Sequence, residues 1–364
     1  MIVLPSLIIW LYLIFAHGKF WRSAPELSAA SPPDFPDVDI IVPARDEALT
    51  IGPAIASLIA QDYSGKFRVL LVDDSSTDGT AALAGASPGL TVISLRSKPC
   101  GWSGKLWALS QGVAESHAPV LFFTDADIIH DPRHLSSLVA KLLQSGTDLV
   151  SEMVHLNCSS LAERALVPAF VYFFQMLYPF NLVNDPRSSV AAAAGGTVLI
   201  RRAALQRVGG IDAIKDSLID DVALARAVKA SGSIYLAHSG LAASIRPYPK
   251  FGDIWHMISR TAFTQLRHSP ALLALTLVAL AAVWLVPAAA ILGGHGWPAA
   301  VGLTAFCLSG GSYLPTLARY GRSRLWALLL PLIALFYMAA TLGSAIDYWR
   351  GRGARWKNRA YGSG

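Results

Sequence analysis

Short apolar runs alternate with helix-like stretches between residues 37 and 246. The apolar runs end in polar residues, and they are 39–44, 68–74, 91–95 and 119–127. The stretches between them have helical spacing, and they lie near 47–61, 77–86, 104–116 and 132–144. Strands that alternate with helices predict an α/β fold, with a mostly parallel sheet covered on both faces. Ligands of such sheets bind at the carboxyl ends of the strands.

The C-terminal part of the chain is apolar. Residues 271–293 and 325–346 carry no charge, and each reaches the roughly 20 residues needed to cross a membrane. A third run, 297–317, is a weaker candidate because glycines and a proline interrupt it. We expect residues 271–346 to form the C-terminal membrane segments.

The N-terminal run is shorter. Residues 1–16 are uncharged, and Lys19 and Arg22 follow them. The basic start and the small-residue cleavage site of a secretory signal peptide are both missing. We therefore predict a retained anchor over 1–22 that enters the cytoplasm, followed by a linker rich in Pro and Ser over 23–36.

Composition supports a membrane protein. Hydrophobic residues make up 53% of the chain and charged residues 15%, whereas soluble domains carry about a quarter charged residues. The net charge of +6 would suit nucleic acid, but basic residues cluster in the tail 347–364, directly after an apolar run. Such clusters orient spans and attract lipid headgroups, so no nucleic acid is expected as a partner. The three cysteines lie far apart, which indicates neither a disulfide framework nor a zinc site.

Three features of the topology stay open. The aromatic stretch 159–183 fits either a buried helix or one that faces an acceptor or the membrane interface. The stretch 247–270 mixes aromatic and basic residues and is predicted to lie in the headgroup plane. If all the C-terminal segments crossed, the basic tail would lie outside, against the positive-inside rule. One of them, such as 297–317, is therefore a candidate re-entrant segment.

Two carboxylates stand at the end of the run 119–127. Asp125 and Asp127, in the sequence TDADI, are separated by one residue. Left bare, they would repel each other, and a divalent cation such as Mn²⁺ or Mg²⁺ would resolve this by taking carboxylate and phosphate oxygens together. A solvated turn is the alternative for this motif taken alone.

Further acids and a lysine follow other predicted strands or begin helices. Asp73 and Asp74 end the run 68–74, where a carboxylate can accept hydrogen bonds from a nucleobase or ribose. Pro43 ends the first run, and Glu47 lies at the expected start of a helix, where acids are common. Lys105 follows Gly104 at a helix start, a position suited to phosphate.

A second acidic pair opens a later helix. Asp220 and Asp221 precede an amphipathic stretch, and Gly195 and Gly196 begin the segment GGTVLIRR. One of the two acids fits an ordinary helix-start residue. The other is a candidate general base that deprotonates an acceptor hydroxyl.

These motifs, in this order, resemble the family 2 glycosyltransferases, whose catalytic domain has the GT-A fold. PARDE, VDDSSTDGT, GKLWAL, TDAD, GGTVLIRRAALQRVGGI and the acidic pair correspond to family motifs over about residues 37–268. The resemblance implies an inverting transfer. Asp127 and Asp125 would bind the metal, and Asp221 would be the base beside Asp220. The nucleotide-sugar would bind at Pro43, Glu47, Asp73, Asp74, Lys105 and Asp125.

The likeness is strongest to the membrane-anchored branch that contains ceramide glucosyltransferases, and within it to the hopanoid-associated glycosyltransferases of bacteria. Asp220 stands where the family usually has Glu. Processive relatives carry a Gln/Arg-x-x-Arg-Trp motif, but the counterpart RTAF keeps only Arg260 and lacks the second arginine and the tryptophan. A non-processive enzyme follows from this departure, with Gly195, Gly196 and Arg260 on the acceptor side.

We therefore expect a GT-A domain over 37–246 in a multi-pass protein of the bacterial inner membrane, with the catalytic domain facing the cytoplasm. Its donor would be a nucleotide-sugar, expected to be UDP-linked, and its acceptor a lipid, with a role in hopanoid metabolism. Two alternatives are a polyprenyl-phosphate glycosyltransferase, which needs no base, and an inactive sugar-nucleotide-binding membrane protein.

Overall fold

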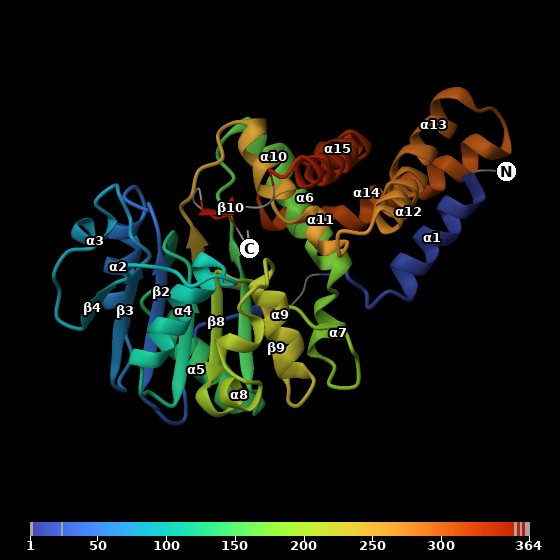
Figure 1. The fold of residues 1–364 in the computed structure, drawn as a ribbon. Coiled ribbons are helices and arrows are strands. Elements are labelled where there is room, and N and C mark those ends of the chain that lie inside the picture. Colours follow the sequence, from blue (N-terminus) through green and yellow to red (C-terminus); the bar gives the residue numbers. More distant parts are fainter. Residues whose placement is uncertain (1–2, 23–24, 353–354, 357–358, 361–364) are drawn as a thin grey trace. The chain divides into compact units, whose positions relative to one another are not determined.

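The computed structural model describes residues 3–22, 25–352, 355–356 and 359–360, which divide into two compact units (Figure 1). The sheet domain comprises 25–157 and 182–247, together with the described residues from 355 onward. The helical unit comprises the described residues up to 22, then 158–181 and 248–352. Each unit is described by itself.

The sheet domain is built on one mixed sheet in the order β1-β9-β7-β8-β5-β2-β3-β4, with β6 paired to β9. Its strands are β1 (Glu26–Leu27), β2 (Val38–Ala44), β3 (Phe67–Asp73), β4 (Leu90–Ser94), β5 (Val120–Thr124), β6 (Ile128–His130), β7 (Leu149–His155), β8 (Thr197–Arg201) and β9 (Ile234–Ser244). The neighbours β5-β2-β3-β4 are all parallel, as are β1-β9-β7. Only β8 and β6 run antiparallel to their partners. The predicted mostly parallel sheet is confirmed.

Helices cover both faces of the sheet. Alternate strand residues point to opposite sides, so each face has apolar side chains that pack against helices. On one face, Ile40 and Val42 of β2 belong to a core that also contains buried residues of α2 (Ile51–Ile59) and α5 (His134–Ser145). On the other face, Ile41 lies against α4 (Gly104–Glu115) at Gly112, where a Cβ would lie 2.4 Å from the Ile41 Cγ2 atom. Glycine at this position lets α4 approach the sheet closely.

The sheet domain has further short elements: α3 (Thr80–Leu83), α8 (Arg202–Arg207), the 3₁₀ turn η1 (Ile211–Ile214), α9 (Asp220–Lys229) and the small hairpin of β10 (Arg355–Trp356) and β11 (Arg359–Ala360). Part of the stretch predicted as a linker forms a strand, since Glu26 and Leu27 of β1 pair with β9. α7 (Phe180–Asn184) spans the division between the two units.

The helical unit consists of α1 (Val3–Phe15), α6 (Leu161–Leu177), α10 (Phe251–Ser259), α11 (Ala262–Gln265), α12 (Pro270–Leu280), the π-helical η2 (Ala281–Leu285), α13 (Val286–Gly293), α14 (Trp297–Arg319), the 3₁₀ segment η3 (Arg324–Leu329) and α15 (Leu330–Trp349). Two continuous runs, Pro270–Gly293 and Arg324–Trp349, are long and apolar enough to cross a membrane. Only 17% and 33% of their most apolar windows are buried, unlike the core helix of a soluble domain.

The aromatic stretch 159–183 forms α6 and the start of α7, and most of α6 is buried. Tyr172 contacts the rings of Trp284 and Tyr313, and its hydroxyl lies 2.7 Å from the Ser312 hydroxyl. Of the two interpretations left open, the structure therefore shows a buried helix. These contacts group 158–181 with the helical unit, although the sequence placed them inside the domain 37–246.

The stretch 247–270 forms two helices, α10 and α11, separated by a turn. Its start is anchored by Glu163, which accepts hydrogen bonds from the backbone N–H groups of Ser159, Ser160 and Tyr248. Trp255 of α10 packs against Phe336 of α15, and a Cβ at Gly343 would lie 2.6 Å from the Trp255 ring. That this stretch lies in the plane of lipid headgroups stays a prediction.

Candidate active site

Strand register brings the predicted residues to one edge of the sheet domain. Ala44 of β2 pairs with Asp73 of β3, so Pro43 and Asp73 lie at the carboxyl ends of neighbouring parallel strands. β5 runs parallel to β2 on its other side, and Asp125 follows its last residue. The alternation of strands and helices predicted this edge, and the register sets the spacing along it.

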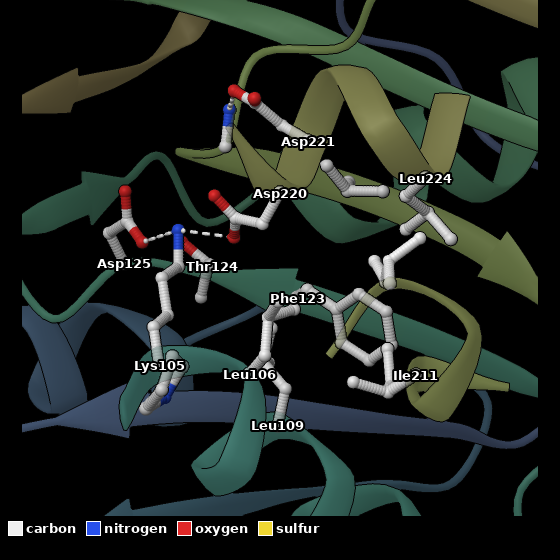
Figure 2. A pocket seen from close by; sticks show the side chains of 14 residues that line it. Lys105, Leu106, Leu109, Phe123, Thr124, Asp125, Ile211, Asp220, Asp221 and Leu224 are labelled. Carbon is white, nitrogen blue, oxygen red and sulfur yellow. Dashed lines mark hydrogen bonds and ion pairs between the residues drawn. The ribbon is translucent and has the colours of Figure 1, made fainter. Parts of the chain in front are cut away.

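Lys105 holds two of the predicted acids together. It stands in the first turn of α4, which is capped by the Ser103 hydroxyl accepting from the Leu106 N–H. Its Nζ lies 2.9 Å from Asp125 Oδ1 and 3.2 Å from Asp220 Oδ2 (Figure 2). Burial opposes its charge, but the two carboxylates hold the pKa of Lys105 well above its ordinary value. Lys105 is therefore a permanent cation between the two acidic motifs.

Asp221 is held by backbone N–H groups rather than by a cation. Its Oδ2 accepts a hydrogen bond of 2.8 Å from Gly195 and its Oδ1 one of 2.8 Å from Val222. Burial and then repulsion from Asp220 raise the pKa of Asp221 to about 7, while Lys105 and the two N–H groups act to lower it. A carboxylate with this pKa can take up a proton near neutral pH.

Gly195 separates Lys105 from Asp221. A Cβ at this position would lie 3.2 Å from Lys105 Nζ and 3.3 Å from Asp221 Oδ2, tighter than ordinary contacts. A Cβ at Gly196 would instead meet Val154 and Ile128. Only the first of the two predicted glycines therefore borders the charged groups.

A small pocket opens beside these charges. Its polar end is formed by Lys105, Asp125, Asp220 and Asp221, and its apolar side includes Leu106, Leu109, Phe123 and Leu224 (Figure 2). The cavity volume is about 20 Å³, which is room for roughly one water molecule. A ligand as large as a sugar would have to occupy the open side of the cluster.

Asp127 has a different environment from Asp125. Its Oδ2 accepts from Arg246 Nε at 2.7 Å and from the Ser244 hydroxyl at 3.2 Å. The same guanidinium donates through Nη2 to Glu47 Oε1 at 2.6 Å. The sequence analysis missed Arg246, whose only signal was a charged residue directly after an apolar strand.

The loop after β2 and the loop after β3 are linked. Asp46 has a left-handed φ of 50°, its N–H donates to the Ser76 hydroxyl, and its carboxylate accepts from the Thr77 N–H. The predicted helix start at Glu47 lies four residues before α2, whose first N–H, that of Ile51, donates to the Glu47 carbonyl. The acids of PARDE thus lie in a turn beside the strand ends.

Asp73, the last residue of β3, and Asp74, which follows it, both contact this linked region. Asp73 accepts from the hydroxyl and the N–H of Ser76. Asp74 is fully buried, and its carboxylate lies 3.5 Å from Arg45 Nη1. The structure therefore places Asp73 at the strand end and Asp74 underneath the loop.

A buried hydrogen-bonded chain lies behind the site. The Thr124 hydroxyl donates to the Gly196 carbonyl at 2.8 Å, so it can only accept from His130 Nε2 at 3.1 Å. Burial holds the pKa of His130 well below its ordinary value. This neutral ring therefore accepts at Nδ1 from His134 Nδ1, at 2.9 Å. A hydrogen bond of 2.5 Å then joins His134 Nε2 to Glu152 Oε2.

This chain links α5 and β7 to the two segments that carry the site, because Thr124 precedes Asp125 and Gly196 follows Gly195. The sequence analysis did not find it, although the spacing of His130 and His134 and a glutamate inside an apolar strand were visible. Arg260, predicted for the acceptor side, belongs to the helical unit, where it follows α10.

Comparisons with known proteins identify the sheet domain. Residues 39–209 match the model of the family described as Glycosyl transferase family 2. The chain carries a family 2 glycosyltransferase domain. The matched residues include Glu47, Asp73, Lys105, Asp125 and Asp127, whereas Asp221 and Arg246 lie beyond them.

Two curated relatives overlap part of this family 2 domain. The succinoglycan biosynthesis protein ExoU of Rhizobium meliloti (strain 1021) is 31% identical over 132 residues, 35% of either chain. The dodecaprenyl-phosphate galacturonate synthase of Rhizobium johnstonii is 26% identical over 117 residues, 31% of this chain and 35% of that protein. The chain thus matches 35% of the length of these relatives.

One solved structure is similar over nearly the whole chain. The mannosyltransferase PcManGT from Pyrobaculum calidifontis, in complex with GDP-Man and Mn²⁺, covers 95% of this chain and 99% of its own, with a TM-score of 0.60 and 19% identity. At this identity the likeness speaks for the fold. The GT-A fold predicted from the motifs is confirmed.

Proposed function

We propose that this protein is a membrane-bound inverting glycosyltransferase that moves one sugar from a nucleotide-sugar to a hydroxyl of a lipid acceptor. The observation that carries the proposal is the pair of contrasting groups beside one pocket. Lys105 is held as a cation between Asp125 and Asp220, and Asp221 has a pKa of about 7. The first group suits a phosphate, and the second suits a proton that is removed during the reaction.

In the proposed reaction, Asp221 takes the proton from the acceptor hydroxyl. The hydroxyl oxygen forms a bond to the anomeric carbon while the bond from that carbon to the diphosphate oxygen breaks. The electron pair of the broken bond goes to the departing nucleoside diphosphate, whose charge Lys105 partly balances. Asp73, at the end of β3, would accept hydrogen bonds from the base or ribose, beside Pro43 and Glu47. Asp74, buried underneath, would support this loop through Arg45.

The acids after β5 fit a divalent cation by their chemistry, because carboxylate oxygens are the ligands that Mn²⁺ or Mg²⁺ prefers. The side chain of Asp125 is 36% exposed and that of Asp127 is 9% exposed. No group of three or more metal-binding side chains occurs in the part of the chain that the structure describes. Asp125 and Asp127 would therefore hold the ion together with phosphate oxygens. When bound, the ion would neutralise charge on the diphosphate.

The acceptor assignment rests on the helical unit. Two apolar helical runs of spanning length, largely unburied, would bring a lipid hydroxyl to the level of a membrane interface. We place the protein in the bacterial inner membrane with the sheet domain on the cytoplasmic side. Arg260, Arg350 and Arg352 would face headgroups. By likeness of its motifs, we assign the acceptor to hopanoid metabolism.

A second candidate function has one observation in its favour, the similarity to a dodecaprenyl-phosphate galacturonate synthase. If the acceptor here were also a polyprenyl phosphate, it would arrive as an anion and would need no general base. Asp221 would then be dispensable. The two functions therefore differ in their dependence on one side chain.

The test uses the full-length protein purified in detergent, radiolabelled nucleotide-sugars of several bases and sugars, and a bacterial lipid extract. The proposal predicts label in the solvent-extracted lipid that survives mild acid, because an ordinary glycoside is stable where a glycosyl phosphate is hydrolysed. Acid-labile lipid label would favour the polyprenyl-phosphate acceptor. Label that appears only as free sugar or water-soluble polymer would contradict both. Parallel reactions with a chelator test the cation.

A further inference from the structure

Arg246 lies between two buried carboxylates at the edge of the sheet domain. Its Nε is 2.7 Å from Asp127 Oδ2, and its Nη2 is 2.6 Å from Glu47 Oε1. The carboxylate side chains are 9% and 8% exposed, whereas that of Arg246 is 27% exposed. One guanidinium thus joins the loop after β2 to the loop after β5 and keeps its own face partly open.

The pairing of β9 with β6 and the hydrogen bonds that follow it set this geometry. Ser244 ends β9, where it pairs with Ile128 of β6, and the Ile245 N–H donates to the Asp127 carbonyl at 2.9 Å. The Arg246 N–H donates a hydrogen bond to the Ser244 hydroxyl, and that hydroxyl donates one to Asp127 Oδ2. Strand pairing therefore places Arg246 next to Asp127.

The position matters because Asp127 is also the proposed metal ligand. A divalent cation on the same carboxylate oxygen would lie close to the guanidinium, and two like charges at such a distance repel strongly in a partly buried site. A nucleoside diphosphate changes this balance, because its phosphate oxygens can bind both a guanidinium and a divalent cation. The donor can thus supply the phosphate oxygens that the guanidinium and the divalent cation both need.

We propose that Arg246 is a resident counter-ion that occupies Asp127 in the donor-free protein and makes divalent-cation binding depend on the nucleotide. This inference rests on the proposed function and adds an order of binding to it, in which the nucleotide binds before the cation. In the absence of donor, the guanidinium keeps the affinity for free cation low. When the nucleotide binds, Arg246 moves its hydrogen bonds from Asp127 to the diphosphate.

The experiment measures Mn²⁺ binding rather than turnover. Free Mn²⁺ is followed by electron paramagnetic resonance during titration of the full-length protein in detergent, with and without UDP or GDP. For the unaltered protein we expect the nucleotide to tighten Mn²⁺ binding by at least about tenfold. For Arg246→Gln without nucleotide, we expect Mn²⁺ to bind about tenfold or more tightly than to the unaltered protein, because the competing charge is gone.

Two further variants keep the test decisive. Arg246→Lys retains a cation and so protects the fold, but a lysine cannot bond both carboxylates in the same fork. Its Mn²⁺ affinity without nucleotide should lie between the other two. Arg207→Gln removes the same charge from an ion pair with Asp148 elsewhere in the domain and should leave Mn²⁺ binding unchanged.

An unchanged or weaker Mn²⁺ affinity in folded Arg246→Gln and Arg246→Lys would overturn the inference and leave the proposed function intact. Arg246 would then be a fixed structural pair. Absence of Mn²⁺ binding in every variant, with or without nucleotide, would remove the cation from the proposed function and this inference with it.

Discussion

The candidate site contains four carboxylates, Asp125, Asp127, Asp220 and Asp221. The two ends of this cluster differ in how their negative charge is balanced. At the end that we propose binds the donor, Asp125 pairs with Lys105 and Asp127 with Arg246, at 2.9 and 2.7 Å. At the end that we propose receives the acceptor, Asp221 makes no ion pair within the described residues and accepts hydrogen bonds from two backbone N–H groups instead. Asp220 connects the two ends, because it pairs with Lys105 and repels Asp221.

This difference separates two chemical tasks within one pocket. Burial raises the pKa of Asp125, but the ion pair with Lys105 opposes this rise and favours the charged carboxylate. It is therefore suited to hold an ion or to orient a phosphate-binding lysine. A buried carboxylate beside another acid gains a proton more easily, and a pKa of about 7 suits a group that must accept one. The fold thus gives acids of the same chemical type different environments, which suit the different roles that we propose for them.

The largest effect is expected from Asp221→Asn, which tests whether Asp221 accepts the proton. The amide keeps the shape and can still accept from Gly195, but it cannot take a proton. We expect turnover to fall by about 10²- to 10⁴-fold, with nucleotide affinity nearly unchanged. Measured kcat and nucleotide Kd provide the check, and Asp216→Asn, on an exposed residue of the preceding loop, serves as the control. Full turnover in the variant would point to an anionic acceptor.

Replacing the shared cation tests the opposite side. Lys105→Gln leaves Asp125 and Asp220 without their common partner, so we expect kcat/KM for the donor to fall by about 10- to 10²-fold. Because Lys105 also lowers the pKa of Asp221, the acid limb of the pH–rate profile should move to higher pH. A variant that changed kcat alone, with the same acid limb, would contradict the link between the two sides.

The pH dependence of the unaltered protein follows from Asp221. A base must be deprotonated to act, so kcat/KM should fall about tenfold per pH unit below about pH 7 and level off above it. Asp220→Asn removes the repulsion that raises this pKa, and the acid limb should move to lower pH. An acid limb that stays in place in Asp220→Asn would argue that another group controls it.

The smallest change concerns the space between the two sides. Gly195 does not have a positive φ, so alanine fits its backbone, but the new Cβ would press on Lys105 Nζ and Asp221 Oδ2. We expect Gly195→Ala to lower kcat/KM by about tenfold or less, with a nearly unchanged thermal midpoint. Gly252→Ala, where a Cβ meets nothing within 4 Å, is the matched control. Equal activity of the two variants would show that the site tolerates a wider spacing.

Several features followed from the sequence because they depend on local patterns. Short apolar runs alternating with stretches of helical spacing predicted the α/β domain. Runs without charge predicted the apolar helices Pro270–Gly293 and Arg324–Trp349. Acids at strand ends predicted one ligand-binding edge, since parallel strands bring their carboxyl ends together. These inferences require only which residues are neighbours along the chain.

Other features depended on contacts between segments far apart in the chain. Arg246 meets Glu47 and Asp127 across the sheet, and Thr124 meets Gly196 behind the site. α6 joined the helical unit because of Tyr172 and its ring contacts, which its aromatic pattern did not determine. Long-range partners of this kind are set by strand register and helix packing, which no local period encodes.

The sequence by itself determined the kinds of groups at this site, namely paired acids, a lysine and glycines at the ends of apolar strands. Only the tertiary structure decided which acid forms an ion pair with a cation and which acid is held by backbone N–H groups. The physical reason is that a carboxylate's proton affinity depends on burial and on charges within a few ångströms. Asp125 and Asp221 are alike in sequence, but Lys105 contacts only the first.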